Sequence, residues 1–436
     1  MAMATNMAMA MAARPKRRIN AMSRAQARLK KVQDRRSIRQ WALRGASVLM
    51  IGALGVLGAV HSLAYRMRQD SPAFAHVLTP WDGRITAKLA EQLSTLAATP
   101  AERAESDRLA IDALAADPMA VSALATLGSN ADVRGDTAKA RRIFADSERL
   151  SRRDLPTHLW AIEDAVKRND IAGALRHYDF AMRTSSSASS ILYPILGKAI
   201  DSADVRQQLT LVLKRQPAWA EGMLAYVAST GNDSGSLMAL FSRLQRDRVP
   251  ISAYINALVV QRLIALGAVQ EAWQYYSQIS PGSDRSQLRD PGFRKVLDHP
   301  TPFDWSVVTD NPGATASLQA NGNSGLLDFS ASTMAGGEVV RQMQLLPPGK
   351  YILEGVSENI AMPSGTHPYW SLVCTGGQEL GRVEIPDSAT NNGRFIGSFT
   401  VPSACASQSL KLIIRPTSDA SSVAGQIGSV SLHPAK

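Results

Sequence analysis

The sequence GASVLMIGALGVLGAVHSLAY, residues 45–65, is an uncharged apolar stretch of 21 residues bounded by Arg44 and Arg66. A helix rising about 1.5 Å per residue needs roughly 20 residues to cross a hydrocarbon core of about 30 Å. Trp41 and Tyr65 stand where aromatic side chains gather at the two membrane interfaces. We therefore predict one membrane-spanning helix at residues 45–65.

The positive charge of the chain is concentrated before this stretch. Residues 1–44 hold 12 Lys and Arg and a single acid, Asp34, so their net charge of +11 equals that of the whole chain. Basic residues close to a span favour its cytoplasmic end. We predict a basic cytoplasmic tail at 1–44, a single pass through an inner membrane, and a periplasmic or otherwise extracytoplasmic location for the bulk of the chain. The absence of net charge beyond residue 44 argues against a nucleic-acid partner.

A cleaved signal peptide is the competing interpretation of the same stretch. Ser62-Leu63-Ala64 resembles the small-x-small pattern that follows the apolar region of such a peptide. The leader of 44 residues and the long apolar run both exceed what is usual there. Translation from Met22 would shorten the leader, so the start codon and cleavage both stay open.

A long helical region follows a short linker at 66–81, which contains Pro72 and Pro80. Apolar residues recur at spacings of three and four from Asp82 to about Ser280, which is typical of amphipathic helices. Within 82–280, turn, small and aromatic residues repeat at an interval of 34 residues: Gly135, Ala140 and Phe144 correspond to Asn169, Ala174 and Tyr178. Gly267, Ala272 and Tyr276 repeat this pattern near the end of the region, with a shift of four residues.

This repeat resembles the tetratricopeptide repeat (TPR) family, whose unit is a 34-residue pair of antiparallel helices. Leu127-Gly128 in the first helix, Gly135 in the turn, and Ala140 and Phe144 in the second helix carry the resemblance. It implies a solenoid that binds a protein partner, with small residues at close helix crossings. Ile162 and Ala131 depart from the family pattern, no basic clamp recurs in successive units, and an ordinary non-repeating helical domain stays the alternative.

The composition of the chain changes again at residues 281–302, which we predict to be a second linker. Residues 303–436 contain about ten short segments of strand composition separated by turn residues, which predicts an all-β antiparallel sandwich of the jelly-roll kind. The expected fold class is therefore α+β and multidomain: a single transmembrane helix, an all-α TPR-like solenoid and a β-sandwich. Only two cysteines are present, Cys374 and Cys405, and an oxidising compartment would favour a disulfide between them over a metal site.

The sandwich is similar in architecture to carbohydrate-binding modules, which commonly bind sugars on aromatic side chains. The resemblance implies Tyr369, His367 and Trp305 as candidate glycan contacts. Alternation along the strand assigns Trp370 to the core instead.

Catalytic and cofactor chemistry finds no support in the sequence motifs. The seven histidines are scattered, and neither a nucleophile with its base nor a metal-ligand or phosphate-binding pattern occurs. We therefore expect no enzyme, no cofactor and no metal. The expected function is a membrane-anchored scaffold of a bacterial-type cell envelope, binding an envelope protein and contacting polysaccharide during its assembly or export. A structural subunit of an envelope complex that binds no glycan is the alternative.

Overall fold

A computed structural model describes residue 24 and residues 38–322, 324–363, 365–417 and 423–435. Nearly all of the predicted basic tail therefore lies outside the described residues. The chain forms two compact units, residues 1–157 and 158–436.

The first unit is helical throughout its described part. Its helices are α3 (Ile38–Met67), α4 (Pro72–Leu78), α5 (Gly83–Leu93), α6 (Pro100–Ala116), α7 (Val121–Val133) and α8 (Thr137–Leu150), and α9 (Leu155–Lys167) crosses into the second unit. Among the described residues, one helical segment, Gln40–Met67, is long and apolar enough to cross a membrane. Residues 40–59 of α3 are exposed, whereas Ala64 is fully buried. The helix α4 lies inside the stretch that the sequence suggested as a linker.

Side-chain caps fix where several of these helices begin. Thr99 and Glu102 form a reciprocal capping box at the start of α6. Asp136 and Asp170, which stand 34 residues apart, each accept a backbone N–H in the first turn of α8 and of α10 (Ile171–Thr184). The repeat seen in the sequence therefore extends to the N-caps.

Close helix packing explains the small residues of the repeat. A Cβ placed on Gly128 in α7 would lie 2.7 Å from the ring of Phe144 in α8, so glycine is needed where this aromatic ring packs. Ala140, Ala174 and Ala272 are buried, as are the aromatic side chains of Tyr178 and Tyr276.

The turns between paired helices share a backbone conformation as well. Gly135, Asn169 and Gly267 all have positive φ, at 83°, 58° and 77°. Glycine and asparagine are the residues that adopt this left-handed region most readily. The correspondence of Gly135 with Asn169 in the sequence thus has a structural basis.

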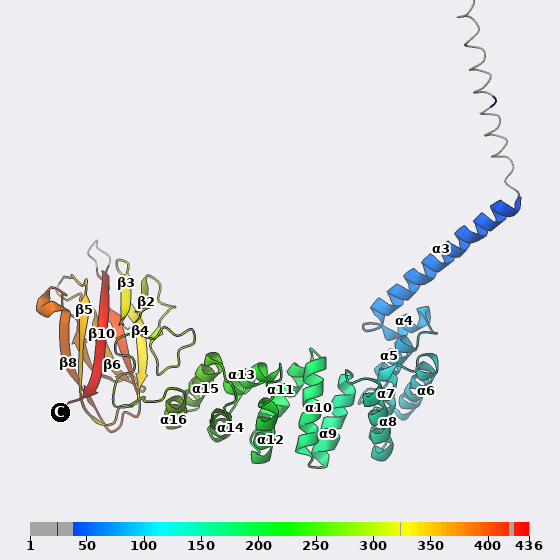
Figure 1. Ribbon diagram of the computed structural model, residues 1–436, viewed down its shortest axis with the longest axis horizontal. Coiled ribbons are helices and arrows are strands. Elements are labelled where there is room, and N and C mark those ends of the chain that lie inside the picture. The colour runs from blue at the N-terminus through cyan, green and yellow to red at the C-terminus, as the bar shows by residue number, and fades with distance from the viewer. Residues whose placement is uncertain (1–23, 25–37, 323, 364, 418–422, 436) are drawn as a thin grey trace, which may run out of the picture. The chain divides into compact units, whose positions relative to one another are not determined.

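The helices of the second unit pack in two layers. Beyond α10 they are α11 (Ala188–Ala199), α12 (Ala203–Leu213), α13 (Ala220–Thr230), α14 (Ser234–Arg246), α15 (Ala253–Ala265) and α16 (Val269–Ile279). Alternate helices contact one another, so α10, α12, α14 and α16 form one row and α11, α13 and α15 the other (Figure 1). This arrangement is that of stacked helix pairs.

The described part of 303–436 is a sandwich of two five-stranded antiparallel sheets, as the sequence predicts. Sheet A has the strand order β1-β4-β9-β6-β7 and sheet B the order β2-β3-β10-β5-β8. The ten strands are β1 (Ser306–Val307), β2 (Ala314–Asn321), β3 (Ser324–Ala331), β4 (Gly337–Gln344), β5 (Gly349–Glu358), β6 (Tyr369–Cys374), β7 (Glu379–Glu384), β8 (Arg394–Val401), β9 (Gln408–Ile414) and β10 (Val423–Pro434). A short 3-10 helix, Thr390–Gly393, precedes β8.

The inner faces of the two sheets enclose one apolar core that includes Trp370, Leu372, Phe399 and Leu412. Leu288 and Phe293 also belong to this core, although they come from the stretch that the sequence suggested as a linker. Cys374 and Cys405 form a disulfide with a Cα–Cα distance of 5.7 Å. The sandwich therefore extends N-terminally to include part of 281–302.

Candidate functional site

The outer face of sheet A is the candidate site of the sandwich, because it carries Tyr369 and several charged side chains. Along β6, Trp370, Leu372 and Cys374 are buried in the core, so Tyr369, Ser371 and Val373 point to the outer face. The pairing of β6 with β7 and β9 then determines which residues stand beside them.

One register row crosses all five strands of this face. Ser371 of β6 pairs with Arg382 of β7 and with Lys411 of β9, Lys411 pairs with Arg341 of β4, and Arg341 pairs with Ser306 of β1. Directly paired residues share one face of a sheet. We call Arg382, Lys411 and Arg341 the basic row.

Carboxylates next to this row balance its charge only in part. Glu338 lies 3.0 Å from Arg341 and 2.8 Å from Lys411, so one carboxylate serves two cations. Arg382 pairs with Glu379 at 2.6 Å, and this hydrogen bond is the main reason why the pKa of Glu379 is lowered. The Arg341 and Lys411 end of the row therefore keeps an excess of positive charge.

Tyr369 lies between two guanidinium groups. The guanidinium carbons of Arg382 and Arg415 are each 4.8 Å from its ring centroid, within the range of cation–π contacts. Arg415 is held by Glu384 at 2.5 Å and by the carbonyl of Gly365. Tyr369 is half-buried, and in the described part of the sandwich it is the one Phe, Tyr or Trp side chain that is not buried.

His367 closes the loop that leads into β6. Its Nε2 lies 3.1 Å from Oδ1 of Asp387, which also accepts the backbone N–H of Met362 at 2.8 Å. The Met362 N–H first, and His367 second, lower the pKa of the Asp387 carboxyl group. His367 therefore shapes the loop beside Tyr369, and its ring is engaged with Asp387.

Trp305, the third aromatic candidate, is placed differently from what the sequence suggested. Its ring is 4 % exposed and packs against Phe293 and Trp370, with centroid distances of 5.2 Å and 5.6 Å. Its indole N–H donates to the carbonyl of Asp290 at 3.0 Å. Trp305 therefore belongs to the core, where its ring cannot serve as a sugar platform. The sequence did not reveal this, because Trp370, which helps to bury it, is distant along the chain.

A groove of about 550 Å³ runs beside the basic row. Arg341 and Lys411 line it together with Ser306, Ser409 and Gln408, and Gln261 of α15 and the prolines 300 and 302 also border it. Hydroxyl, amide and cationic groups therefore meet in one concave surface. Such a surface suits a polar and negatively charged ligand.

A buried arginine lies between the last helix and the sandwich. Arg289 is 8 % exposed, and its guanidinium donates to the carbonyls of Phe303 and Met343 and to Oε1 of Gln344. The side-chain amide of Gln342 bonds to both backbone groups of Arg289. Burial lowers the pKa of Arg289 to about 10.

Aromatic packing surrounds this joint on the helical side. The Arg289 guanidinium lies 5.4 Å from the ring of Trp273 in α16, and that ring packs edge-on against Phe303. Tyr276 of α16 donates its hydroxyl to Asp304 at 2.7 Å. Burial, with the nearby Asp304 as a second cause, raises the pKa of Tyr276 to about 12. We call these contacts the α16–sandwich joint.

Sequence reasoning missed the basic row and the joint. The members of the row lie far apart along the chain, and only strand register brings them together. A weak signal was present, since an arginine or lysine on the polar face of β4, β7 and β9 is visible in the alternation of each strand. The sequence did not show which strands are neighbours in the sheet.

No family model matches the chain, and no curated protein matches it. Among solved structures it is similar to the pilus biogenesis factor PilW, with 18% identity over 46% of this chain and 95% of that one, and a TM-score of 0.24. A carbohydrate-binding module of the Cellvibrio mixtus lichenase 5A, in complex with cellotriose, matches with 10% identity over 31% of this chain and 98% of that one, and a TM-score of 0.20.

A third match is the enzymatically active domain of tailspike protein 4 from bacteriophage CBA120. Its identity is 13%, its TM-score is 0.22, and the match covers 30% of this chain and 20% of the tailspike. The chain thus spans a fifth of the length of that protein. With TM-scores this low, the function has to be argued from the residues of the chain itself.

Proposed function

We propose that this protein is a membrane-tethered, non-catalytic scaffold of a bacterial-type cell envelope. In this proposal α3 is the anchor, the helical repeats bind a protein partner, and the outer face of sheet A contacts an acidic polysaccharide. The membrane proposal is supported by the length and composition of α3 and by the basic residues before it. A disulfide in the part of the chain that follows α3 adds to this support.

The observation that carries the glycan part is the excess charge of the basic row. Arg341 and Lys411 line the groove and share one carboxylate, Glu338, so a ligand carboxylate could pair with the cation that Glu338 leaves partly unbalanced. Ser306 and Gln261 add groups that hydrogen-bond to hydroxyls. Tyr369 is not among the residues that line the groove, and its ring is contacted by Arg382 and Arg415. A neutral glycan would use the hydrogen-bonding groups of Ser306 and Gln261 but not the excess positive charge, so a carboxylated polysaccharide is the better fit.

The structural-subunit alternative calls for a broad apolar patch on the sandwich. Within the described part of 303–436, the large apolar side chains that are exposed are Met334, between β3 and β4, and Ile396 in β8, and Val296 and Leu297 are exposed in the segment before it. They do not form such a patch, which favours the glycan proposal over a purely structural role for this domain.

We expect the full-length protein in lipid nanodiscs to bind a polyuronate such as alginate and to bind a neutral dextran more weakly. Replacing Arg341 and Lys411 together with glutamine should weaken polyuronate binding by about tenfold or more, since charge-assisted hydrogen bonds contribute about 1.5 kcal/mol or more each. The binding should also fall as salt rises. Affinity electrophoresis or interferometry would measure it.

Arg394→Gln is the matched control, because Arg394 is an exposed arginine of the other sheet. It should bind alginate as the unmodified protein does. If the unmodified protein binds neither polymer at low salt, yet still co-purifies with envelope proteins, the structural-subunit function replaces the glycan one.

A further inference from the structure

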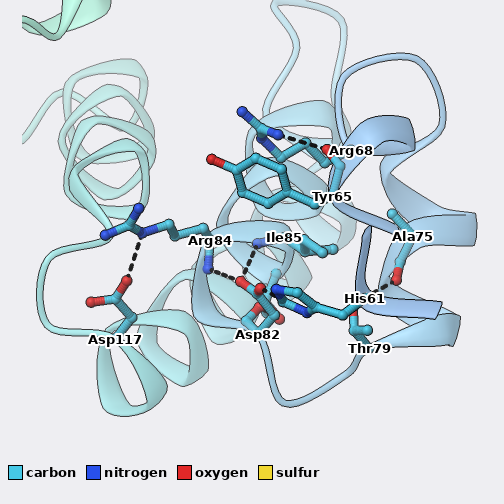
Figure 2. Close-up of polar contacts among 10 residues, drawn as sticks. His61, Tyr65, Arg68, Ala75, Thr79, Asp82, Arg84, Ile85 and Asp117 are labelled. Carbon is cyan, nitrogen blue, oxygen red and sulfur yellow. Dashed lines mark hydrogen bonds and ion pairs between the residues drawn. The ribbon is translucent and has the colours of Figure 1, made fainter. Parts of the chain in front are cut away.

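The C-terminal end of α3 is built into the first helices of the N-terminal unit. Ala64 of α3, Ala75 of α4 and Ile85 of α5 are fully buried in one cluster, against which Met67 and Leu78 pack. Ala64 is thus a core residue of the folded unit as well as a member of the apolar helix. Figure 2 shows how closely the end of α3 approaches α4 and the start of α5.

Polar contacts are also made where the end of α3 meets α4 and α5. His61 of α3 faces Asp82, with Nδ1 and Oδ2 3.8 Å apart, and Asp82 caps α5 by accepting the backbone N–H groups of Arg84 and Ile85 (Figure 2). Arg68 donates to the backbone carbonyl of Tyr65 at 2.6 Å, and its guanidinium carbon lies 3.5 Å from the centre of the Tyr65 ring. These contacts begin at His61, four residues before the apolar stretch ends.

The position of Asp82 sets a limit on membrane depth. A carboxylate is strongly disfavoured in hydrocarbon. Asp82 lies beside His61, so the hydrocarbon boundary must fall at or before His61, and about 20 residues counted back from there reach Trp41. Arg44 would then lie near the opposite end, where a long side chain can extend to the headgroups. The level of His61 and Asp82 is therefore the level of the membrane interface.

Large apolar side chains are exposed on α3, on α4 and just before Asp82, in the segments that meet at this junction. They are Leu63, Phe74, Val77 and Trp81, with 50%, 48%, 76% and 61% of their surface exposed, and we call them the apolar collar. Phe74 and Val77 are three residues apart in α4, on a different side of the helix from Pro72 and Ala75, which are buried. Trp81 directly precedes Asp82.

We propose that the apolar collar binds the lipid bilayer at its interface, so that α4 and Trp81 rest on the membrane in which α3 is anchored. The inference rests on the proposed membrane anchoring. Its occupant follows from continuity, because α4 packs on α3 at Ala64, one turn beyond the hydrocarbon boundary. Tryptophan is enriched at this depth, and Arg66 directly follows the apolar stretch, where a long basic side chain can reach lipid phosphates.

The arrangement has a consequence for the whole N-terminal unit. A helix held only by a flexible linker would leave the unit free to move above the membrane. A buried Ala64 and an apolar collar in the bilayer interface would instead hold α4 and α5 at one depth. The first helix pair would then keep a defined height above the membrane surface.

Site-specific labelling tests the depth directly. Both native cysteines are in the disulfide, so one introduced cysteine accepts an environment-sensitive NBD label selectively. The full-length chain would be labelled at Val77→Cys, at Leu57→Cys in α3, and at Leu96→Cys, whose side chain is 96% exposed in a loop of the same unit. Each variant is placed in phospholipid vesicles, and quenching by aqueous iodide is compared with quenching by nitroxide-labelled lipid.

We expect the Leu57 label to be quenched by lipid nitroxide alone and the Leu96 label by iodide alone. The Val77 label should be brighter than the Leu96 label by about twofold or more and should be quenched best by a nitroxide near the headgroups. A Val77 label as open to iodide as the Leu96 label, with Leu57 shielded, overturns the collar and leaves the anchor intact. Shielding of Val77 from both quenchers would mean that protein covers the collar, which also overturns the inference.

Open access of iodide to the Leu57 label is a different outcome. It would mean that α3 does not enter the bilayer, so the proposed anchoring itself would fail. The three positions therefore separate failure of the collar from failure of the proposed function.

Discussion

Replacing Arg289 with methionine is expected to lower the free energy of unfolding of the α16–sandwich joint by at least about 3 kcal/mol. The guanidinium donates to the carbonyls of Phe303 and Met343 and to the amide oxygen of Gln344, and makes a longer contact of 3.4 Å with the carbonyl of Gln287. Each buried acceptor left without a donor costs about 1 to 3 kcal/mol. Methionine keeps much of the length of the side chain, so the loss is mainly one of hydrogen bonds. Urea unfolding of the full-length protein, monitored by protease cleavage within residues 281–302, would measure this change in free energy.

Arg294→Met is the control for this substitution. Arg294 is exposed in the same segment, and its replacement should change the free energy of unfolding by less than about 0.5 kcal/mol. Arg289→Lys should fall between the two, because an ammonium group keeps the charge but cannot reach three acceptors in the fork geometry of a guanidinium. Equal stability of the Arg289→Met and Arg294→Met variants would show that the joint does not depend on Arg289.

Removing the disulfide is expected to destabilise the sandwich by about 3 to 4 kcal/mol. Cys374 and Cys405 are 31 residues apart, and closing a loop of this length restricts the unfolded chain by about that amount in the entropy model. The double substitution Cys374→Ala and Cys405→Ala removes the bond while leaving two small apolar side chains at buried positions. Denaturant unfolding of the oxidised protein and of the double variant gives the difference.

Reduction provides the internal control for the disulfide. Adding dithiothreitol should destabilise the unmodified protein and leave the double variant unchanged. An unmodified protein that unfolds at the same denaturant concentration with and without reductant would show that the bond contributes nothing to stability.

In the helical region, local sequence patterns correspond to features of the structure. Gly135 and Asn169 occupy equivalent turns with positive φ, and Ala140 and Ala174 are buried at equivalent positions. Contacts in a helix pair join residues close in sequence, so the spacing of those residues is visible in the amino-acid sequence alone. The same holds for the ten strands, because alternation is a local property of each strand.

The candidate site depends on contacts that local patterns do not contain. Trp305 looked like an available aromatic group, but Phe293 and Trp370 bury it, and neither is its neighbour in sequence. Arg341 and Lys411 become one surface only because β4 pairs with β9, with Lys411 opposite Arg341. The polar residues of a strand could be predicted, whereas their partners across the sheet could not.

The same distinction applies at the end of α3. The apolar stretch could be recognised from composition, and Tyr65 was a reasonable choice for its interface. The contact of His61 with Asp82 moves the inferred interface about one helical turn towards the N-terminus. This contact joins two segments separated by α4, so it depends on how the first helices pack.

If α3 spans the membrane once, the helical repeats and the sandwich lie on the side of the membrane opposite the basic tail. Two reporters fused after Lys436 would show on which side this end lies: alkaline phosphatase, which is active only outside the cytoplasm, and a fluorescent protein that matures only inside it. We predict full phosphatase activity and no fluorescence, because the 12 basic residues of 1–44 hold the tail on the cytoplasmic side. Fluorescence without phosphatase activity would contradict the orientation, and with it the proposed contact of the sandwich with envelope polysaccharide.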